Sequence, residues 1–103
     1  ILCNENNWAW SLASDFNPNC QSLSIPMAGS LATHRMRVDP IAALAASTRN
    51  PATTLTDDRL IDGIISVGSK ANFNVLHSHL IESWCQTPGQ SPIFETYIMG
   101  ERY

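Results

Sequence analysis

The segment that most restricts the fold of this chain is Asp39-Pro40, which directly precedes the apolar residues 41–46. Aspartate favours the N-cap of a helix, and proline favours the first helical position because its missing N–H would have no partner there. Alanine and leucine, which make up most of the following run, have high helix propensity. The sequence therefore predicts a helix over residues 40–48, ending before Pro51 because the residue preceding a proline is biased away from helical dihedral angles.

Alternation of apolar and polar side chains predicts strands before this helix. Trp8, Trp10 and Leu12 occupy every second position of residues 8–14, and a similar period of two occurs over residues 22–27 and 31–38. Residues 15–19 collect turn formers and separate the first two strands. Residues 92–99 are rich in Ile, Phe, Thr and Tyr and predict a closing strand.

Two further helices are expected in the second half of the chain. Thr56 can cap a helix over residues 57–67, although Gly63 weakens it and the apolar residues 64–67 would also suit a buried strand. Over residues 70–86, one apolar stripe recurs at helical spacing and predicts a long packing helix. Its members are Phe73, Leu76, Leu80, Ile81 and Trp84.

These elements predict the α+β class: a small, mostly antiparallel sheet with two or three helices packed on one face. A length of 103 residues has room for one ordinary domain, so residues 1–103 are expected to form a single domain.

Charge and hydropathy exclude two classes of partner. The formal net charge is -3, which gives little electrostatic support for binding a phosphate backbone, so no nucleic-acid partner is expected. The apolar runs fall far short of the roughly 20 residues that cross a bilayer, so no membrane span is expected either.

The three cysteines, Cys3, Cys20 and Cys85, favour an oxidising environment. A Cys3–Cys20 disulfide would close a short loop, and the remaining thiol could link the chain to a partner protein or to a second processed chain. The alternative is three reduced thiols that pack as small apolar groups. The single lysine and the many Ser, Thr and Asn residues also favour a secreted, extracellular protein.

His34, His77 and Cys85 are the candidate catalytic residues. On the expected elements, His34 and His77 face the core, where each could act as a general acid or base or be a hydrogen-bonded structural residue. Cys85 could act as a nucleophile only with an imidazole in hydrogen-bond reach. No cysteine or histidine spacing matches a metal site and no cofactor motif is complete, so neither a metal nor a cofactor is expected.

Two pairs of side chains are candidate binding residues. Arg35 and Arg37 lie on the same side of the expected strand 31–38, and their forked donors suit a carboxylate or a phosphate. Trp8 and Trp10 are either core residues or aromatic anchors of a protein interface.

The sequence thus predicts a small secreted, non-enzymatic binding protein: a toxin, an effector, or one chain of a processed hetero-oligomer that acts through surface contacts with a protein or cell-surface target. The alternatives are a scaffold subunit and a small enzyme that uses His77 or His34 as acid or base in a pocket between helix and sheet.

Overall fold

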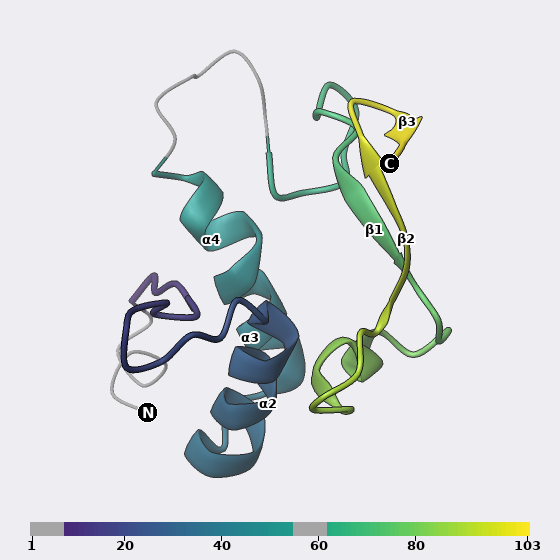
Figure 1. Cartoon of the computed structure of the whole chain (residues 1–103). Helices are drawn as coiled ribbons and strands as arrows, with labels where there is room; N and C mark the ends of the chain where they lie inside the picture. The colour runs from purple at the N-terminus through teal and green to yellow at the C-terminus, as the bar shows by residue number, and fades with distance from the viewer. Residues whose placement is uncertain (1–7, 55–61) are drawn as a thin grey trace.

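The computed structural model describes residues 8–54 and 62–103. Two layers lie side by side, with helices on one side and a small sheet on the other (Figure 1). The helices are α2 (Ile25–Met36), α3 (Pro40–Ser47) and the short α4 (Arg49–Ala52). The strands β1 (Phe73–Leu76), β2 (Ile93–Ile98) and β3 (Glu101–Arg102) form an antiparallel sheet in the order β1-β2-β3. The predicted α+β class is confirmed.

Helix α3 confirms the prediction over residues 40–48. The Asp39 carboxylate accepts hydrogen bonds from the backbone N–H groups of Ile41 and Ala42, at 2.9 and 3.0 Å. Ala43 and Ala46 are completely buried on its inner face. The helix therefore begins where its cap and its proline place it, and it packs through its smallest side chains.

Helix α2 replaces the strands expected over residues 22–27 and 31–38, and that prediction was wrong. The Ser24 hydroxyl caps the helix by accepting the Met27 N–H at 3.2 Å, and Pro26 lies in the first turn, where no intrahelical donor is needed. The buried side of α2 consists of Gly29, Ser30 and Ala32, so no stripe of large apolar residues marks it in the sequence.

The long helix expected over residues 70–86 is also absent. This segment forms β1 and then the 3-10 helix η1 (Ile81–Cys85), joined by a bend at residues 77–79. Backbone pairing of β1 with β2 decides the outcome, with Phe73 opposite Tyr97 and Val75 opposite Glu95. A distant partner strand thus overrides a local helical period.

Two other expectations differ from the structure. Residues 8–14 form no strand, although alternate side chains are half-buried and the Leu12 N–H donates to the Ala46 carbonyl at 2.8 Å. Of the helix expected over residues 57–67, residues 57–61 lie outside the described ranges and residues 62–67 are irregular. Gly63 has a φ of 76°, which a right-handed helix does not permit.

The closing strand and the first turn were predicted correctly. Strand β2 occupies Ile93–Ile98, within residues 92–99. Asn17 and Cys20 pair across a tight turn, and the Asn17 side chain accepts the Asn19 and Cys20 N–H groups at 2.9 and 3.1 Å.

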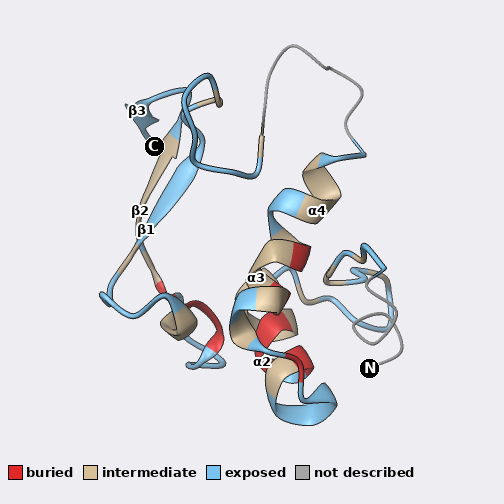
Figure 2. Cartoon of the chain, turned by 180° about the vertical axis from the view of Figure 1, so that it is seen from behind, coloured by how far each residue is buried: buried red, intermediate tan, exposed pale blue. Residues whose placement is uncertain are grey.

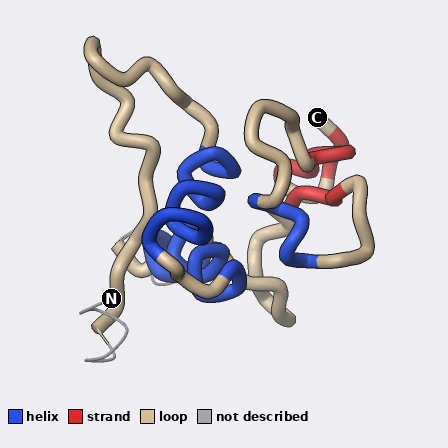
Figure 3. The backbone as a smooth tube through the Cα atoms, turned by 90° about the horizontal axis from the view of Figure 1, so that it is seen from below, coloured by secondary structure: helices blue, strands red, loops and turns tan. Residues whose placement is uncertain are grey.

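The core lies where η1 meets the helices, as the buried segments in Figure 2 show. Trp84 and Cys85 of η1 are buried together with Ala32, Val38 and Ala43. The Trp84 indole N–H donates to the Pro40 carbonyl at 3.0 Å, and the Ser30 hydroxyl donates to the Cys85 carbonyl. Seen from below, η1 lies between the helices and the strands (Figure 3), so it joins the two layers.

Candidate functional site

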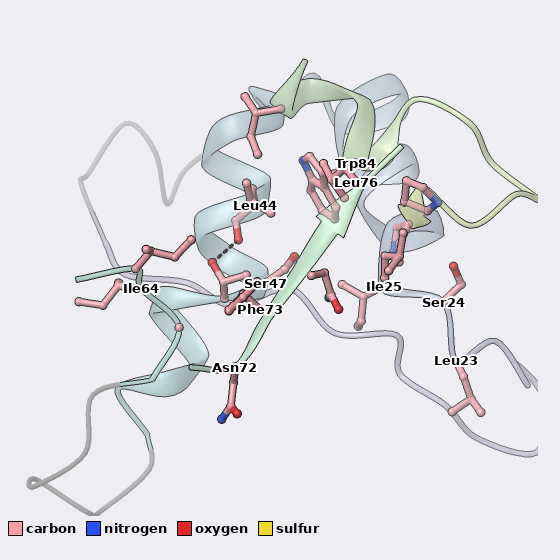
Figure 4. A pocket seen from close by; sticks show the side chains of 18 residues that line it. Leu23, Ser24, Ile25, Leu44, Ser47, Ile64, Asn72, Phe73, Leu76 and Trp84 are labelled. Atoms are coloured by element: carbon pink, nitrogen blue, oxygen red, sulfur yellow. Dashed lines mark hydrogen bonds between the residues drawn. The ribbon is translucent and has the colours of Figure 1, made fainter. Parts of the chain in front are cut away.

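A pocket of about 620 Å³ lies between the helical layer and the sheet (Figure 4). The segment before α2, the first turn of α2, and α3 line one side; β1, η1 and the start of β2 line the other; residues 63–65 lie at one end. Its lining side chains are Leu23, Ser24, Ile25, Pro26, Leu44, Ser47, Thr48, Ile64, Ile65, Asn72, Phe73, Asn74, Leu76, Ile81, Trp84, Pro92 and Ile93, with Gly63 contributing backbone.

The pocket surface is mainly apolar and carries no ionisable side chain. Its polar groups are largely committed to the fold. The Ser47 and Thr48 hydroxyls each donate at 2.9 Å to a carbonyl one turn earlier in α3, and the Thr48 bond is drawn in Figure 4. The Asn74 side-chain oxygen accepts the Thr96 hydroxyl at 2.8 Å. This pocket can therefore bind apolar groups, but it offers no acid, base or nucleophile.

The two candidate histidines lie outside this pocket. His34 is exposed in the last turn of α2. His77 is exposed in the bend after β1, where its ring meets the Phe94 ring edge-on with centroids 5.2 Å apart. The expected core-facing positions are wrong for both, because the strand and the helix that would have turned them inward are not formed.

Cys85 is buried, and its thiol lies 3.7 Å from the Thr33 hydroxyl and 3.7 Å from the Glu82 carbonyl. Neither neighbour is an imidazole, so the structure does not form the Cys–His arrangement that nucleophilic chemistry would need. Cys85 acts as a small core residue.

The predicted Cys3–Cys20 disulfide is wrong, because Cys20 is exposed with a free thiol. Cys3 itself lies outside the described residues. The loop that the disulfide was expected to close is instead stabilised at the Asn17–Cys20 turn by backbone and asparagine side-chain hydrogen bonds.

The arginine pair and the tryptophan pair do not come together as one site. Arg35 and Arg37 are exposed at the C-terminal end of α2, and Arg37 caps it with a φ of 57°. Trp8 is 62% exposed, whereas Trp10 is half-buried against the core and its carbonyl accepts the Asn50 side-chain N–H at 2.8 Å. Trp10 is thus a packing residue, and Trp8 is the exposed member of the pair.

Two charged clusters lie on and beside the sheet. Lys70 Nζ lies 2.7 Å from Asp62 Oδ2; its hydrogen bond and charge hold the pKa of Asp62 below its usual value, and Asn72 contributes a further hydrogen bond. On β2, the Tyr97 hydroxyl donates to Glu95 at 2.9 Å, and this bond and the Glu95 charge raise the pKa of Tyr97. Arg102 pairs with the same carboxylate at 3.0 Å. The first cluster joins Asp62 to the residues that lead into β1, and the second links β2 to β3.

Within residues 8–54 and 62–103, no group of three or more His, Cys, Asp or Glu side chains could hold a metal ion. None of the helices in these ranges has the length and the apolar character needed to cross a bilayer.

Sequence reasoning missed the pocket because it placed residues 70–86 on one helix. The aromatic and β-branched residues of Phe73-Asn74-Val75-Leu76 were the available signal for a strand. A strand at this position has two faces and a free edge, whereas the expected helix would have presented one apolar stripe to the core.

Comparison with known proteins shows a partial likeness to enzymes. Over 75 residues, covering 69% of this chain, the sequence is 39% identical to the probable imidazolonepropionases of Bos taurus and Homo sapiens. It is 37% identical over 68 residues to the probable imidazolonepropionase of Danio rerio. The chain spans about a sixth of the length of these curated relatives, 17% of the first two and 16% of the third. No protein-family model matches.

These relatives overturn the prediction of a non-enzymatic toxin or effector, because the proteins that this chain resembles are named as enzymes. The misleading signals were low lysine content and an odd number of cysteines, both properties of composition and not of a site. An extracellular location and a protein partner stay predictions. What the chain shares with known proteins is a stretch of sequence similar to part of an imidazolonepropionase.

Proposed function

We propose that this chain contributes to an enzyme of the imidazolonepropionase type. The observation that carries the proposal is the 39% identity over 69% of the chain to two such proteins. It favours the enzyme alternative over a surface-binding protein. The substrate implied by the relatives' name is an imidazolone ring that carries a propionate group.

The negative charge of that substrate argues against the pocket between the helices and the sheet as its binding site. A propionate carboxylate is ionised at neutral pH, and burying it without a cation or hydrogen-bond donors is costly. The pocket between the helices and the sheet has no cationic side chain in its lining. We therefore assign the pocket to packing and not to substrate binding.

Arg35 and Arg37 are the candidate partners for the carboxylate within the described residues. Both side chains are exposed, and no ion pair engages either of them in the parts of the chain that the structure describes. A guanidinium presents parallel donors that match a carboxylate. In the proposed enzyme, these two side chains orient the propionate group while other parts of the protein act on the ring.

A segment exchange tests the proposed function. In the human probable imidazolonepropionase, the stretch that matches this chain is replaced by the corresponding residues of this chain, and consumption of imidazolonepropionate is followed by proton NMR. The intact human protein is the positive control and the protein lacking the stretch is the negative control. We expect the exchanged protein to consume substrate and the deleted protein to be inactive.

The Arg35→Gln and Arg37→Gln variants of the exchanged protein test substrate orientation. We expect KM to rise with little change in kcat, because uniform binding of the propionate is lost. An exchanged protein that folds, as judged by circular dichroism, yet consumes substrate no faster than the deleted one contradicts the proposed function.

A further inference from the structure

The pocket between the helices and the sheet has an unusually exposed apolar lining. Leu23 is 76% exposed, Ile65 92% and Ile81 48%. Soluble monomers seldom leave contiguous apolar surface of this kind uncovered unless it binds something. Trp84, by contrast, is 4% exposed at the inner end, so the pocket is open along its rim and closed at its base.

Strand β1 contributes its free edge to this lining. It is the outer strand of the order β1-β2-β3, so one of its edges has no partner strand among the described residues. Successive residues of a strand point to opposite faces, yet both Phe73 and Asn74 line the pocket. The strand therefore meets the pocket along its edge, where unpaired N–H and C=O groups can pair with an added extended segment.

The chemistry of the lining specifies the occupant. No charged side chain borders the pocket, and the Ser47, Thr48 and Asn74 oxygens are engaged in hydrogen bonds. A complementary occupant is uncharged and apolar, and it supplies backbone donors and acceptors to the edge of β1. An extended apolar polypeptide segment meets all of these requirements.

The relatives indicate where such a segment would come from. The matched stretch covers only 17% of the bovine and human proteins, so most of their length lies outside it. We infer that the pocket is a docking groove in which an extended apolar segment, supplied by the remainder of an imidazolonepropionase-type chain, pairs with the free edge of β1. This inference rests on the proposed function, because the proposed enzyme supplies the partner.

The test uses the full 103-residue chain and the human probable imidazolonepropionase lacking its matched stretch, mixed and followed by isothermal titration calorimetry and light scattering. We expect a one-to-one complex. Ile65→Asp and Leu23→Asp place a charge in the groove and are expected to weaken binding by roughly tenfold or more, since a carboxylate must then be buried without a partner.

Matched controls are Val67→Asp and Leu31→Asp, which introduce the same charge at exposed apolar positions outside the groove lining. The affinity of these two control variants for the shortened human protein is expected to equal that of the unchanged chain. Hydrogen exchange of residues 73–76 is expected to slow on complex formation, because their outward N–H groups become paired.

Four outcomes overturn the inference: no complex, equal weakening by the groove and control variants, unchanged exchange of β1, or self-association of the chain through the groove. If the deleted human protein does not fold, the exchanged protein gives the same comparison in one chain. There, the groove variants should lower Tm and the controls should not. Binding is measured without catalysis, so the two proposals can fail separately. A complex that forms while the exchanged protein consumes no substrate contradicts the proposed function alone. Substrate consumption with no effect of the groove variants on binding or Tm contradicts the docking groove alone.

Discussion

At the scale of single residues, the contact between Gly29 and Trp84 holds the two layers together. A Cβ atom on Gly29 would lie 2.8 Å from Cζ3 and 2.9 Å from Cζ2 of the indole, and closer still to Cη2. Trp84 is buried, so its ring has little room to move. Only a residue without a side chain allows α2 to approach η1 this closely.

Gly29→Ala is therefore expected to destabilise the fold. Alanine favours a helix over glycine by about 1 kcal/mol, but overpacking a rigid core costs about 1–3 kcal/mol, so the second effect should prevail. Urea unfolding measures the change. In a Trp84→Phe background the smaller ring should relieve the clash, and an equal cost in both backgrounds would contradict this contact.

The Asp62–Lys70 pair makes a prediction about pH. The folded pKa of Asp62 lies below its usual value of 3.8, first because of the hydrogen bond from Lys70. Burial acts in the opposite direction, and the Lys70 charge and the Asn72 hydrogen bond lower the pKa further. The pair therefore contributes stability above pH 3.8, which is lost as the pH falls through the folded pKa. Lys70→Met should move the Asp62 pKa back toward 3.8, and Lys70→Arg should not. A carboxyl NMR titration that gives the same Asp62 pKa in Lys70→Met as in the unchanged chain would show that Lys70 does not lower this pKa.

His34 and His77 are expected to be dispensable for catalysis. A general acid or base contributes about 10²–10⁴-fold to rate, but both imidazoles are exposed, His34 in the last turn of α2 and His77 in the bend after β1. In the exchanged enzyme, His34→Gln and His77→Gln should change kcat by less than about twofold. A loss of a hundredfold or more in either variant would restore that histidine as the acid or base.

At the scale of secondary structure, α3 is held by local interactions and β1 by distant ones. The cap, the proline and the alanines of α3 lie within nine residues of one another, so a short window of sequence suffices to predict it. Strand β1 has only the weaker local signal of its aromatic and β-branched residues, and it forms through its pairing with β2, about twenty residues away. Helix α2 lies between these cases, since its Ser24 cap is local but its buried side is made of small residues.

Asp39→Ala should destabilise the protein by about 1 kcal/mol, because two N–H groups at the start of α3 lose their acceptor. Urea unfolding should show a lower midpoint with an unchanged slope. Asp39→Asn keeps a capping oxygen and is expected to lie close to the original stability. Equal losses in Asp39→Ala and Asp39→Asn would mean that the charge of Asp39, and not its cap, is what stabilises the helix.

At the scale of the whole molecule, a small core and a wide apolar groove coexist. The buried apolar residues in the described ranges are Ala32, Val38, Ala43, Ala46, Trp84 and Cys85, of which only Trp84 is large. The sheet reaches this core mainly through η1 and Leu76. A molecule built this way gains stability when its groove is covered.

The isolated chain is accordingly expected to bind the dye 8-anilinonaphthalene-1-sulfonate while folded, with a several-fold rise in fluorescence, because the groove exposes apolar surface. Addition of the human protein that lacks the matched stretch should reduce this fluorescence. Circular dichroism checks that the chain is folded in the assay. Fluorescence that stays high in the complex would place the dye elsewhere on the molecule.

Local sequence signals suffice to predict α3, the turn at residues 15–19, the closing strand and the α+β class, because these depend on caps, prolines and β-branched runs that act over a few residues. Long-range packing fixed the rest of the fold. It made α2 a helix with a face of small residues, paired β1 with β2, and opened the groove between them. It also placed His34 and His77 in solvent. Packing and strand pairing join residues far apart in the chain, so a helical or alternating pattern that spans a few residues does not identify the distant partner.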